Sequence, residues 1–234
     1  MTENSFVRDN LLRIREQMDA ACLRAGRSTN SVELLAVTKT VEPALINEAI
    51  AAGVTAIGEN RVQEFLGKRD QLHLDGVKTH LIGHLQTNKV KSIVGQVDMI
   101  QSVDSERLAT AIGKASVALS KKTDVLVEVN IGREPQKSGV LPENLGALLE
   151  KISPIAGVSV CGLMTVPPIL HTEIEKRKIF SEMYQLFVDI RAKKLDNINM
   201  NILSMGMSGD FAEAILEGAT TVRIGTAIFG HRQY

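Results

Sequence analysis

A lysine ends an apolar run near the start of the chain. Lys39 closes the segment LLAVTK (34–39), whose preceding residues are apolar apart from Thr38. An amine at the rim of an apolar core is partly desolvated, which disfavours the ammonium form and lowers the pKa of such a group. The neutral amine is a nucleophile that forms a Schiff base with an aldehyde. Position alone leaves another interpretation open, in which Lys39 extends from a strand end into solvent.

Two segments near the end of the chain are suited to binding an anion. SMGMSGD (204–210) places small residues in a loop before a predicted helix, and VRIGTAIFG (222–230) places Gly225 and Thr226 at a predicted helix start. Backbone N–H groups at a helix start bind phosphate, and Ser or Thr hydroxyls add donors. Taken singly, Gly225 fits a tight turn and Ser208 fits a helix cap. Because the two segments follow the last two predicted strands, together they predict a phosphate site.

Arg223 lies two residues before Gly225, so both face the same side of a strand. An amine and a phosphate site around one cavity suit an aldehyde that carries a phosphate, and pyridoxal 5′-phosphate is such a molecule. The Arg223 guanidinium keeps its protons at ordinary pH, so it would donate a hydrogen bond to the ring nitrogen and leave that nitrogen unprotonated. The ring is then a weaker electron sink than beside an aspartate. An interior salt bridge is the alternative role for Arg223.

Strands and helices alternate along the chain and must position these residues. Eight apolar runs have the nearly continuous pattern of strands buried on both faces, which favours a parallel sheet. Amphipathic segments lie between them, at 43–52, at 105–119 with Asp104 as N-cap, and at 172–193. A further helix precedes the first strand. The strands are predicted at 33–38, 54–58, 79–83, 97–102, 124–129, 158–164, 201–205 and 221–225.

Eight strand–helix units in succession predict a single (β/α)8 TIM barrel with an extra N-terminal helix. A doubly wound sheet is the alternative. One barrel accounts for the whole chain, so we expect residues 1–234 to form one domain. In such barrels the active site lies at the C-terminal ends of the strands, and polar or small residues follow the predicted strands at those ends.

Composition excludes several classes of function. The chain has 27 basic and 27 acidic residues, so no surplus of positive charge is available to neutralise a nucleic acid. The two cysteines, Cys22 and Cys161, stand outside any cluster of metal-ligand residues, and free thiols suit a reducing compartment. No apolar stretch approaches the ~18–20 residues that span a bilayer. We therefore expect a cytoplasmic protein without metal, membrane or nucleic-acid partners.

Several longer segments have unusual sequences. They are LLAVTK, IGENRVQE (57–64), HLIGHLQTNK (80–89), EVNIGREPQKSG (128–139), CGLMTVPP (161–168), LSMGMSGDFAEAI (203–215) and VRIGTAIFG. In these segments, and from about residue 5 to the C-terminus, the chain resembles the pyridoxal phosphate homeostasis protein family. That family is a single barrel similar to the N-terminal domain of alanine racemase.

The resemblance implies that pyridoxal phosphate is bound covalently on Lys39. It also implies that Lys137, in QKSG, matches a family lysine linked to cofactor exchange. The remaining implied contacts are to the phosphate from Ser208, Gly225 and Thr226, with Ser204 and Met205 close by, to the pyridine nitrogen from Arg223, and to the cofactor from Asn60.

The resemblance does not imply an established reaction, because family members influence vitamin B6 levels and are thought to hold or hand on the cofactor. A racemase of the related fold needs a second base from another domain, and we expect no such domain here. The two tyrosines are Tyr184, in a predicted helix, and Tyr234. We therefore expect a monomeric carrier or buffer without catalytic turnover that passes pyridoxal phosphate transiently to apo-enzymes. A small pyridoxal-phosphate racemase or lyase and a cofactor-free Schiff-base aldolase are the alternatives.

Overall fold

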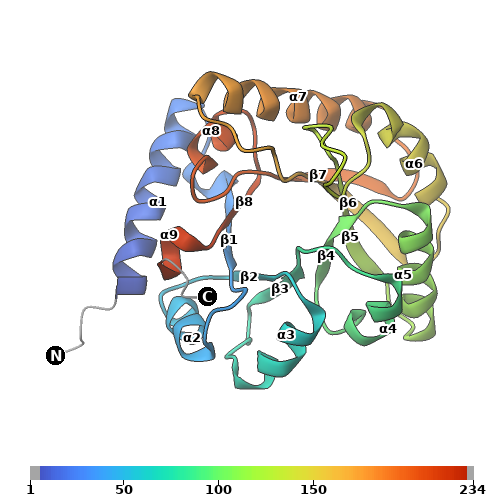
Figure 1. The fold of residues 1–234 in the computed structure, drawn as a ribbon, viewed down its shortest axis with the longest axis horizontal. Helices are drawn as coiled ribbons and strands as arrows, with labels where there is room; N and C mark the ends of the chain where they lie inside the picture. The colour runs from blue at the N-terminus through green and yellow to red at the C-terminus, as the bar shows by residue number, and fades with distance from the viewer. Residues whose placement is uncertain (1–5, 231–234) are drawn as a thin grey trace.

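The computed structural model describes residues 6–230, which form a closed barrel of eight parallel strands (Figure 1). Each strand pairs with the next along the chain, and the last pairs with the first. Closure confirms the predicted barrel and excludes the doubly wound sheet. Tyr234 and both chain ends lie outside the described residues. The strands are β1 Glu33–Val37, β2 Ala56–Glu59, β3 Lys78–Leu81, β4 Met99–Val103, β5 Thr123–Glu128, β6 Val158–Met164, β7 Ile198–Ser204 and β8 Thr221–Ile224.

Helices surround the barrel, and the predicted N-terminal helix is present. The N-cap expected at Asp104 is wrong, because Ser105 occupies that position and its Oγ accepts a hydrogen bond from Leu108 N at 3.4 Å. The extended backbone before a helix suits a cap whose hydroxyl reaches the third helical residue. The helices are α1 Phe6–Arg24, α2 Pro43–Ala51, α3 Val62–Lys68, α4 Val90–Ile93, α5 Glu106–Ala118, α6 Leu145–Ile152, α7 Glu173–Ala192, α8 Phe211–Leu216 and α9 Thr226–Phe229.

The apolar core has one layer inside the barrel and a larger one between the barrel and the helices. Strand side chains alternate between these layers. In β1, Ala36 belongs to the outer cluster, whereas Leu35 and Val37 pack with Ala56 in a separate inner cluster. Continuing the alternation past Val37 directs Thr38 outward and Lys39 inward. The strand pattern therefore decides which side chains reach the open end of the barrel.

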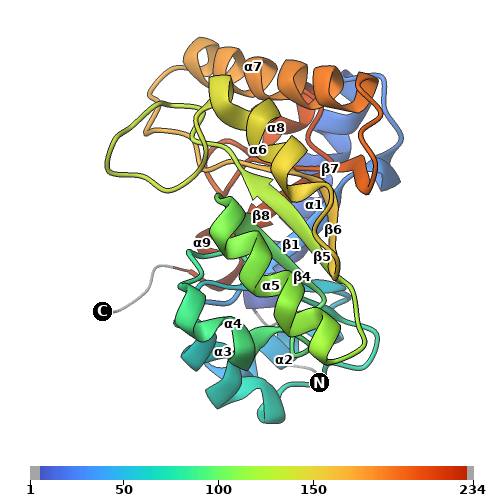
Figure 2. The ribbon, with the colours of Figure 1, turned by 90° about the vertical axis from the view of Figure 1, so that its right-hand side faces the viewer.

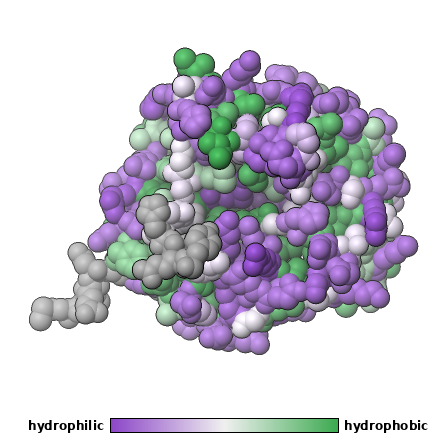
Figure 3. All heavy atoms as spheres, viewed as in Figure 1, coloured by the Kyte–Doolittle hydropathy of each residue, from purple (hydrophilic) through white to green (hydrophobic). Residues whose placement is uncertain are grey.

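The open end formed by the C-terminal ends of the strands is called the mouth below. Figure 2 shows the long segments that follow β5 and β6 extending beyond the barrel on this side. Figure 3 shows mainly hydrophilic residues on the face seen in Figure 1, with small apolar areas between them. Among the helices of residues 6–230, none combines the length and apolar character that a membrane crossing requires.

Candidate functional site

A cavity of about 320 Å³ lies at the mouth, beside the ends of β1, β2, β7 and β8. Its wall combines an amine, a guanidinium, an amide, hydroxyls and glycine backbone with a few apolar side chains. This composition suits a small polar ligand that has both a ring and an anionic group. The lining residues predicted from the sequence are Lys39, Asn60, Ser208, Arg223, Gly225 and Thr226.

Lys39 reaches the cavity because it continues the inward-facing positions of β1. The β1–β8 register pairs Leu35 with Arg223, so the inward side chains of the two strands are neighbours. Lys39 is half-buried and Arg223 is buried. The amine and the guanidinium thus approach one cavity from adjacent strands, as the sequence predicted.

The segment after β7 and the start of α9 form the part of the wall that is suited to binding an anion. The Ser208 hydroxyl accepts from Gly225 N at 3.4 Å and from Ala227 N at 3.3 Å. Both bonds are long for an amide donor, so these N–H groups are weakly satisfied by the protein alone. Met207 N donates to Asp210 Oδ1 at 2.6 Å, which fixes the turn that presents Ser208. Hydroxyl and amide donors therefore converge where a phosphate site was expected.

Arg223 is held by two hydrogen bonds from its terminal nitrogens. Nη1 donates to Ser204 Oγ at 2.8 Å, and Nη2 donates to the Thr165 carbonyl oxygen at 2.7 Å. Burial lowers the pKa of Arg223 to about 10, against the opposing effect of the Glu128 and Asp210 carboxylates. The guanidinium remains protonated at neutral pH, so it can only donate.

A chain of buried polar side chains continues from Arg223 through the barrel interior. Ser204 Oγ donates to Gln101 Oε1 at 2.8 Å, and Gln101 Nε2 lies 2.8 Å from His80 Nδ1. Burial lowers the pKa of His80, so the neutral ring can accept at Nδ1. Neither Gln101 nor His80 was predicted from the sequence to belong to the site. The signal available was a polar residue at an inward position of an otherwise apolar strand.

Three other predicted residues lie apart from the cavity wall. Ser204 faces the barrel interior, where its observed contacts are with Arg223 and Gln101. Met205 is fully buried in the outer apolar core. Lys137 Nζ donates to the Pro167 carbonyl oxygen at 3.0 Å and pairs with a Glu134 carboxylate oxygen at 2.5 Å, which ties the segment after β5 to the segment after β6.

Glu128, at the end of β5, is a further buried carboxyl and was not among the residues predicted for the site. Burial, and to a smaller extent the nearby Asp104 carboxylate, raise its pKa to about 7 against the opposing effect of Arg223. A carboxyl with such a pKa exchanges its proton near neutral pH. Within residues 6–230, His, Cys, Asp and Glu side chains form no cluster of three or more that could hold a metal.

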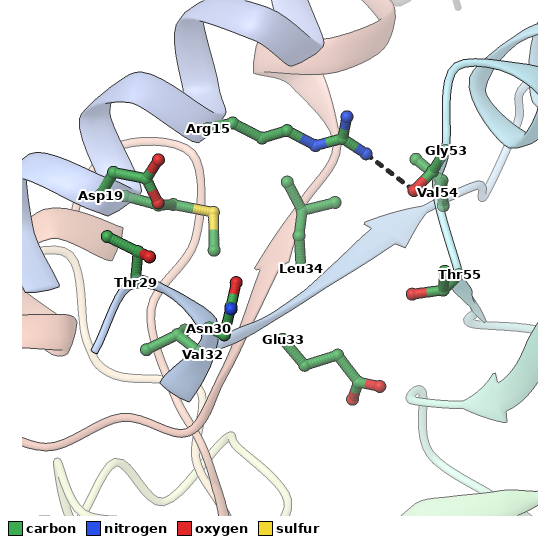
Figure 4. Close-up of a pocket in the computed structure, with 11 residues that line it drawn as sticks. Arg15, Asp19, Thr29, Asn30, Val32, Glu33, Leu34, Gly53, Val54 and Thr55 are labelled. Atoms are coloured by element: carbon green, nitrogen blue, oxygen red, sulfur yellow. Dashed lines mark hydrogen bonds between the residues drawn. The ribbon is translucent and has the colours of Figure 1, made fainter. Parts of the chain in front are cut away.

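A second cavity, of about 340 Å³, lies at the opposite end of the barrel (Figure 4). Arg15 borders it and donates to the carbonyl oxygens of Ala52 at 3.1 Å and Gly53 at 2.7 Å. These contacts fasten α1 to the turn before β2. The predicted site residues lie at the other end, so we assign the candidate site to the mouth.

The chain is similar to known proteins over nearly all of its length. The family model described as "Alanine racemase, N-terminal domain" matches residues 10–233. A protein of Aquifex aeolicus named pyridoxal phosphate homeostasis protein is 45% identical over 226 residues, covering 97% of this chain and 98% of that protein. A protein of the same name from Escherichia coli is 37% identical, covering 96% of each chain.

A solved structure of PipY from Synechococcus elongatus with PLP bound superposes with a TM-score of 0.81 at 34% identity. The match covers 93% of this chain and all of PipY.

Proposed function

The chain belongs to the alanine racemase N-terminal domain family and, within it, to the pyridoxal phosphate homeostasis proteins, and we propose that it binds pyridoxal 5′-phosphate to maintain intracellular vitamin B6 supply. It acts as a carrier or buffer for the cofactor. The mouth cavity is the main support for this proposal, because Lys39, Arg223 and Ser208 all line it. PipY, which spans nearly the same length, has PLP bound.

The cavity wall fits each part of this cofactor. The hydroxyl of Ser208 and the backbone around Gly225 and Thr226 hold the phosphate, because the N–H groups of Gly225 and Ala227 make only long hydrogen bonds within the protein. Arg223 donates to the ring nitrogen, and Asn60 borders the ring. Ser204 contributes through Arg223, and Met205 supports the loop through its buried side chain.

Lys39 holds the cofactor covalently and reversibly. Its neutral amine adds to the aldehyde carbon, a C=N bond forms and one water molecule leaves. Hydrolysis of the same bond returns the free aldehyde, so the carrier releases what it took up. When bound, pyridoxal phosphate supplies an electrophilic aldehyde and a ring that can withdraw electrons.

We propose that the protein has no catalytic turnover of its own. Arg223 at the ring nitrogen keeps that nitrogen unprotonated, which weakens electron withdrawal from a bound amino acid. The curated relatives that the chain matches nearly end to end are named for homeostasis and not for a reaction. A racemase would instead need a second base beside the cavity, to reach the opposite face of the substrate α-carbon.

The proposal extends to the organisation and partners of the chain. Residues 1–234 act as one cofactor-binding domain, monomeric and cytoplasmic, and the cofactor passes to apo-enzymes during brief encounters. Free thiols at Cys22 and Cys161 suit that compartment. Lys137, tied to the segment that borders the cavity, takes part in exchange.

Reduction with borohydride tests the covalent link. The reagent adds two hydrogens to the C=N bond and makes the adduct permanent, so a digest of the reduced protein should carry a pyridoxyl group on the peptide containing Lys39. Lys39→Ala should lose both the adduct and the visible absorbance of the imine. A pyridoxyl group on another residue, or on none, overturns the proposal.

Cofactor transfer to an apo-enzyme and turnover of amino acids distinguish the carrier function from an enzymatic function. Mixing the cofactor-loaded protein with an apo-enzyme should restore that enzyme's activity in step with loss of imine absorbance. Incubation with amino acids should give no product faster than free pyridoxal phosphate does. Faster product formation would favour the racemase or lyase instead.

A further inference from the structure

The peptide groups on both sides of Lys39 are held by one charged pair on α3. The pair consists of Glu64 and Lys68, which lie one helical turn apart with Lys68 Nζ 3.0 Å from Glu64 Oε1. Lys68 Nζ donates to the Thr38 carbonyl oxygen at 2.8 Å, and Glu64 Oε1 accepts from Thr40 N. Lys39 is thus flanked by two backbone contacts, both made by this one pair.

From these contacts we infer that Lys68 and Glu64 are positioning residues that hold the Lys39 amine in the geometry needed for Schiff-base formation. This inference rests on the proposed function. Both residues lie behind β1, because Thr38 is directed outward where Lys39 is directed inward. They therefore act on Lys39 through the backbone and not on the cofactor.

The backbone conformation shows why such a brace is needed. Thr40 has a φ of 58°, in the left-handed region that β-branched residues rarely adopt. Such a conformation costs about 1–3 kcal/mol and persists only where surrounding contacts fix it. The acceptor at Glu64 supplies one such contact on the N–H of Thr40. The turn after Lys39 is therefore held in place by α3.

The cluster also contains a buried carboxylate whose bonding is incomplete. Glu59 pairs with Lys68, and its Oε1 accepts from Thr38 Oγ1 at 2.7 Å. Its other oxygen, Oε2, is buried and has no hydrogen-bond partner within residues 6–230. Buried ion pairs often stabilise a fold less than apolar packing of the same volume. A cluster with this cost is better explained by its fixed geometry around Lys39 than by stability.

A lysine contact of similar kind lies beside Ser208 and provides a control, although its partner carboxylate is on a different helix. Lys176 on α7 donates from Nζ to the Gly209 carbonyl oxygen at 2.8 Å and lies 3.4 Å from Glu213 Oε1. Gly209 directly follows Ser208. Loss of Lys176 should therefore disturb phosphate binding, whereas loss of Lys68 should disturb the amine.

Binding of two ligands distinguishes these effects. The affinity for each ligand is measured in wild type and in the variants Lys68→Met, Glu64→Ala and Lys176→Met. Pyridoxal 5′-phosphate forms the Schiff base, while pyridoxine 5′-phosphate has an alcohol in place of the aldehyde and cannot. Lys68→Met and Glu64→Ala should weaken pyridoxal phosphate binding about tenfold and change pyridoxine phosphate binding less than about twofold. Lys176→Met should weaken both ligands by a similar factor. Lys68→Arg, which keeps the charge and a donor, should recover part of the loss.

Equal weakening of the two ligands in Lys68→Met and Glu64→Ala would reduce the cluster to a general structural support and overturn the inference. So would unchanged binding of pyridoxal phosphate. Because Glu64 is less buried than Lys68, Glu64→Ala provides the test if Lys68→Met does not fold. If wild type itself forms no adduct at Lys39, the proposed function fails, and that outcome is distinct from a failure of this inference.

Discussion

Ser204 Oγ accepts a hydrogen bond from Arg223 Nη1 at 2.8 Å, inside the barrel and below the residues that border the mouth cavity. Ser204 in turn donates to Gln101, so the guanidinium is the end of a buried polar chain. We expect a hydroxyl in this place to affect ligand binding by orienting Arg223. This relationship separates Ser204 from Ser208, although both serines lie within one short segment.

The two serines should therefore respond differently to loss of the ligand's phosphate. Ser208→Ala removes a phosphate donor, so it should weaken pyridoxal 5′-phosphate binding about tenfold and leave pyridoxal binding nearly unchanged. Ser204→Ala loosens Arg223, so it should weaken both ligands by a similar factor. Titration of each variant with both ligands, followed by imine absorbance, measures the difference. If Ser204→Ala affected the phosphorylated ligand alone, Ser204 would be a phosphate contact instead.

Gln101 joins the two halves of the buried polar chain. Gln101→Leu leaves Ser204 Oγ and His80 Nδ1 without this partner, and each unpaired buried group costs about 1–3 kcal/mol. We expect a lower free energy of unfolding in urea and an affinity for pyridoxal phosphate reduced about three- to tenfold. Thr123→Val is a control, because it removes the buried bond of 2.7 Å between Thr123 and Ser116 outside the mouth. Both variants should lose stability, but Thr123→Val should bind as wild type does.

A result with equal binding in Gln101→Leu and wild type would show that Arg223 keeps its orientation through Thr165 alone. The Thr165 carbonyl accepts from the other guanidinium nitrogen at 2.7 Å, so this outcome has a defined structural basis.

The raised pKa of Glu128 predicts that the stability of the protein depends on pH. Its pKa is raised by burial from 4.5 to about 7, so the folded protein binds this proton more tightly than the unfolded chain. The stabilisation is fully present below the unfolded pKa and is lost as the pH rises through the folded pKa. Relative to Glu128→Gln, wild type should lose about 3 kcal/mol in free energy of unfolding across this range.

Urea unfolding of the apo-protein at several pH values, with wild type and Glu128→Gln compared at each, measures this loss. The exposed Glu150→Gln is the control and should track wild type throughout. A constant difference between wild type and Glu128→Gln would mean that Glu128 ionises in the folded protein as it does in the unfolded chain.

Much of the fold follows from the sequence because barrel strands are buried on both faces. Their apolar runs marked all eight strands to within a few residues, and the residues just after them include Lys39 and Asn60 at the cavity. Arg223 was identified for a similar reason, since side chains two apart on a strand share a face. These inferences need only local periodicity and the rule that barrel sites lie at the C-terminal strand ends.

What the sequence did not reveal depends on contacts between distant segments. Gln101 lies 103 residues from Ser204, and only barrel closure brings them together. The brace from Lys68 to the Thr38 carbonyl spans 30 residues and uses a helix that the apolar pattern did not mark. The cap was predicted at Asp104 but is Ser105. Both residue types suit that role, so only the backbone conformation distinguishes the two positions.

Lys137 and Glu134 form the last testable relationship, at the edge of the mouth. Asn130 shapes their segment by donating from Nδ2 to the Glu134 carbonyl oxygen at 2.8 Å and accepting from Glu134 N at 3.1 Å. Lys137 then donates to Pro167 O at 3.0 Å, next to Val166 in the cavity wall. The pair thus ties two flanking segments together beside the mouth cavity.

If this tie controls exchange, Lys137→Met and Glu134→Gln should both speed cofactor release, because each weakens the link between the segments. The rate is measured by transfer of pyridoxal phosphate to an excess of apo-enzyme, and we expect an increase of about three- to tenfold in each variant. Lys151→Met, which removes an exposed lysine 3.7 Å from Glu106 on the barrel side, should release at the wild-type rate. A lower release rate in Lys137→Met with no change in Glu134→Gln would instead indicate that the Lys137 amine itself accepts the aldehyde from Lys39 during exchange.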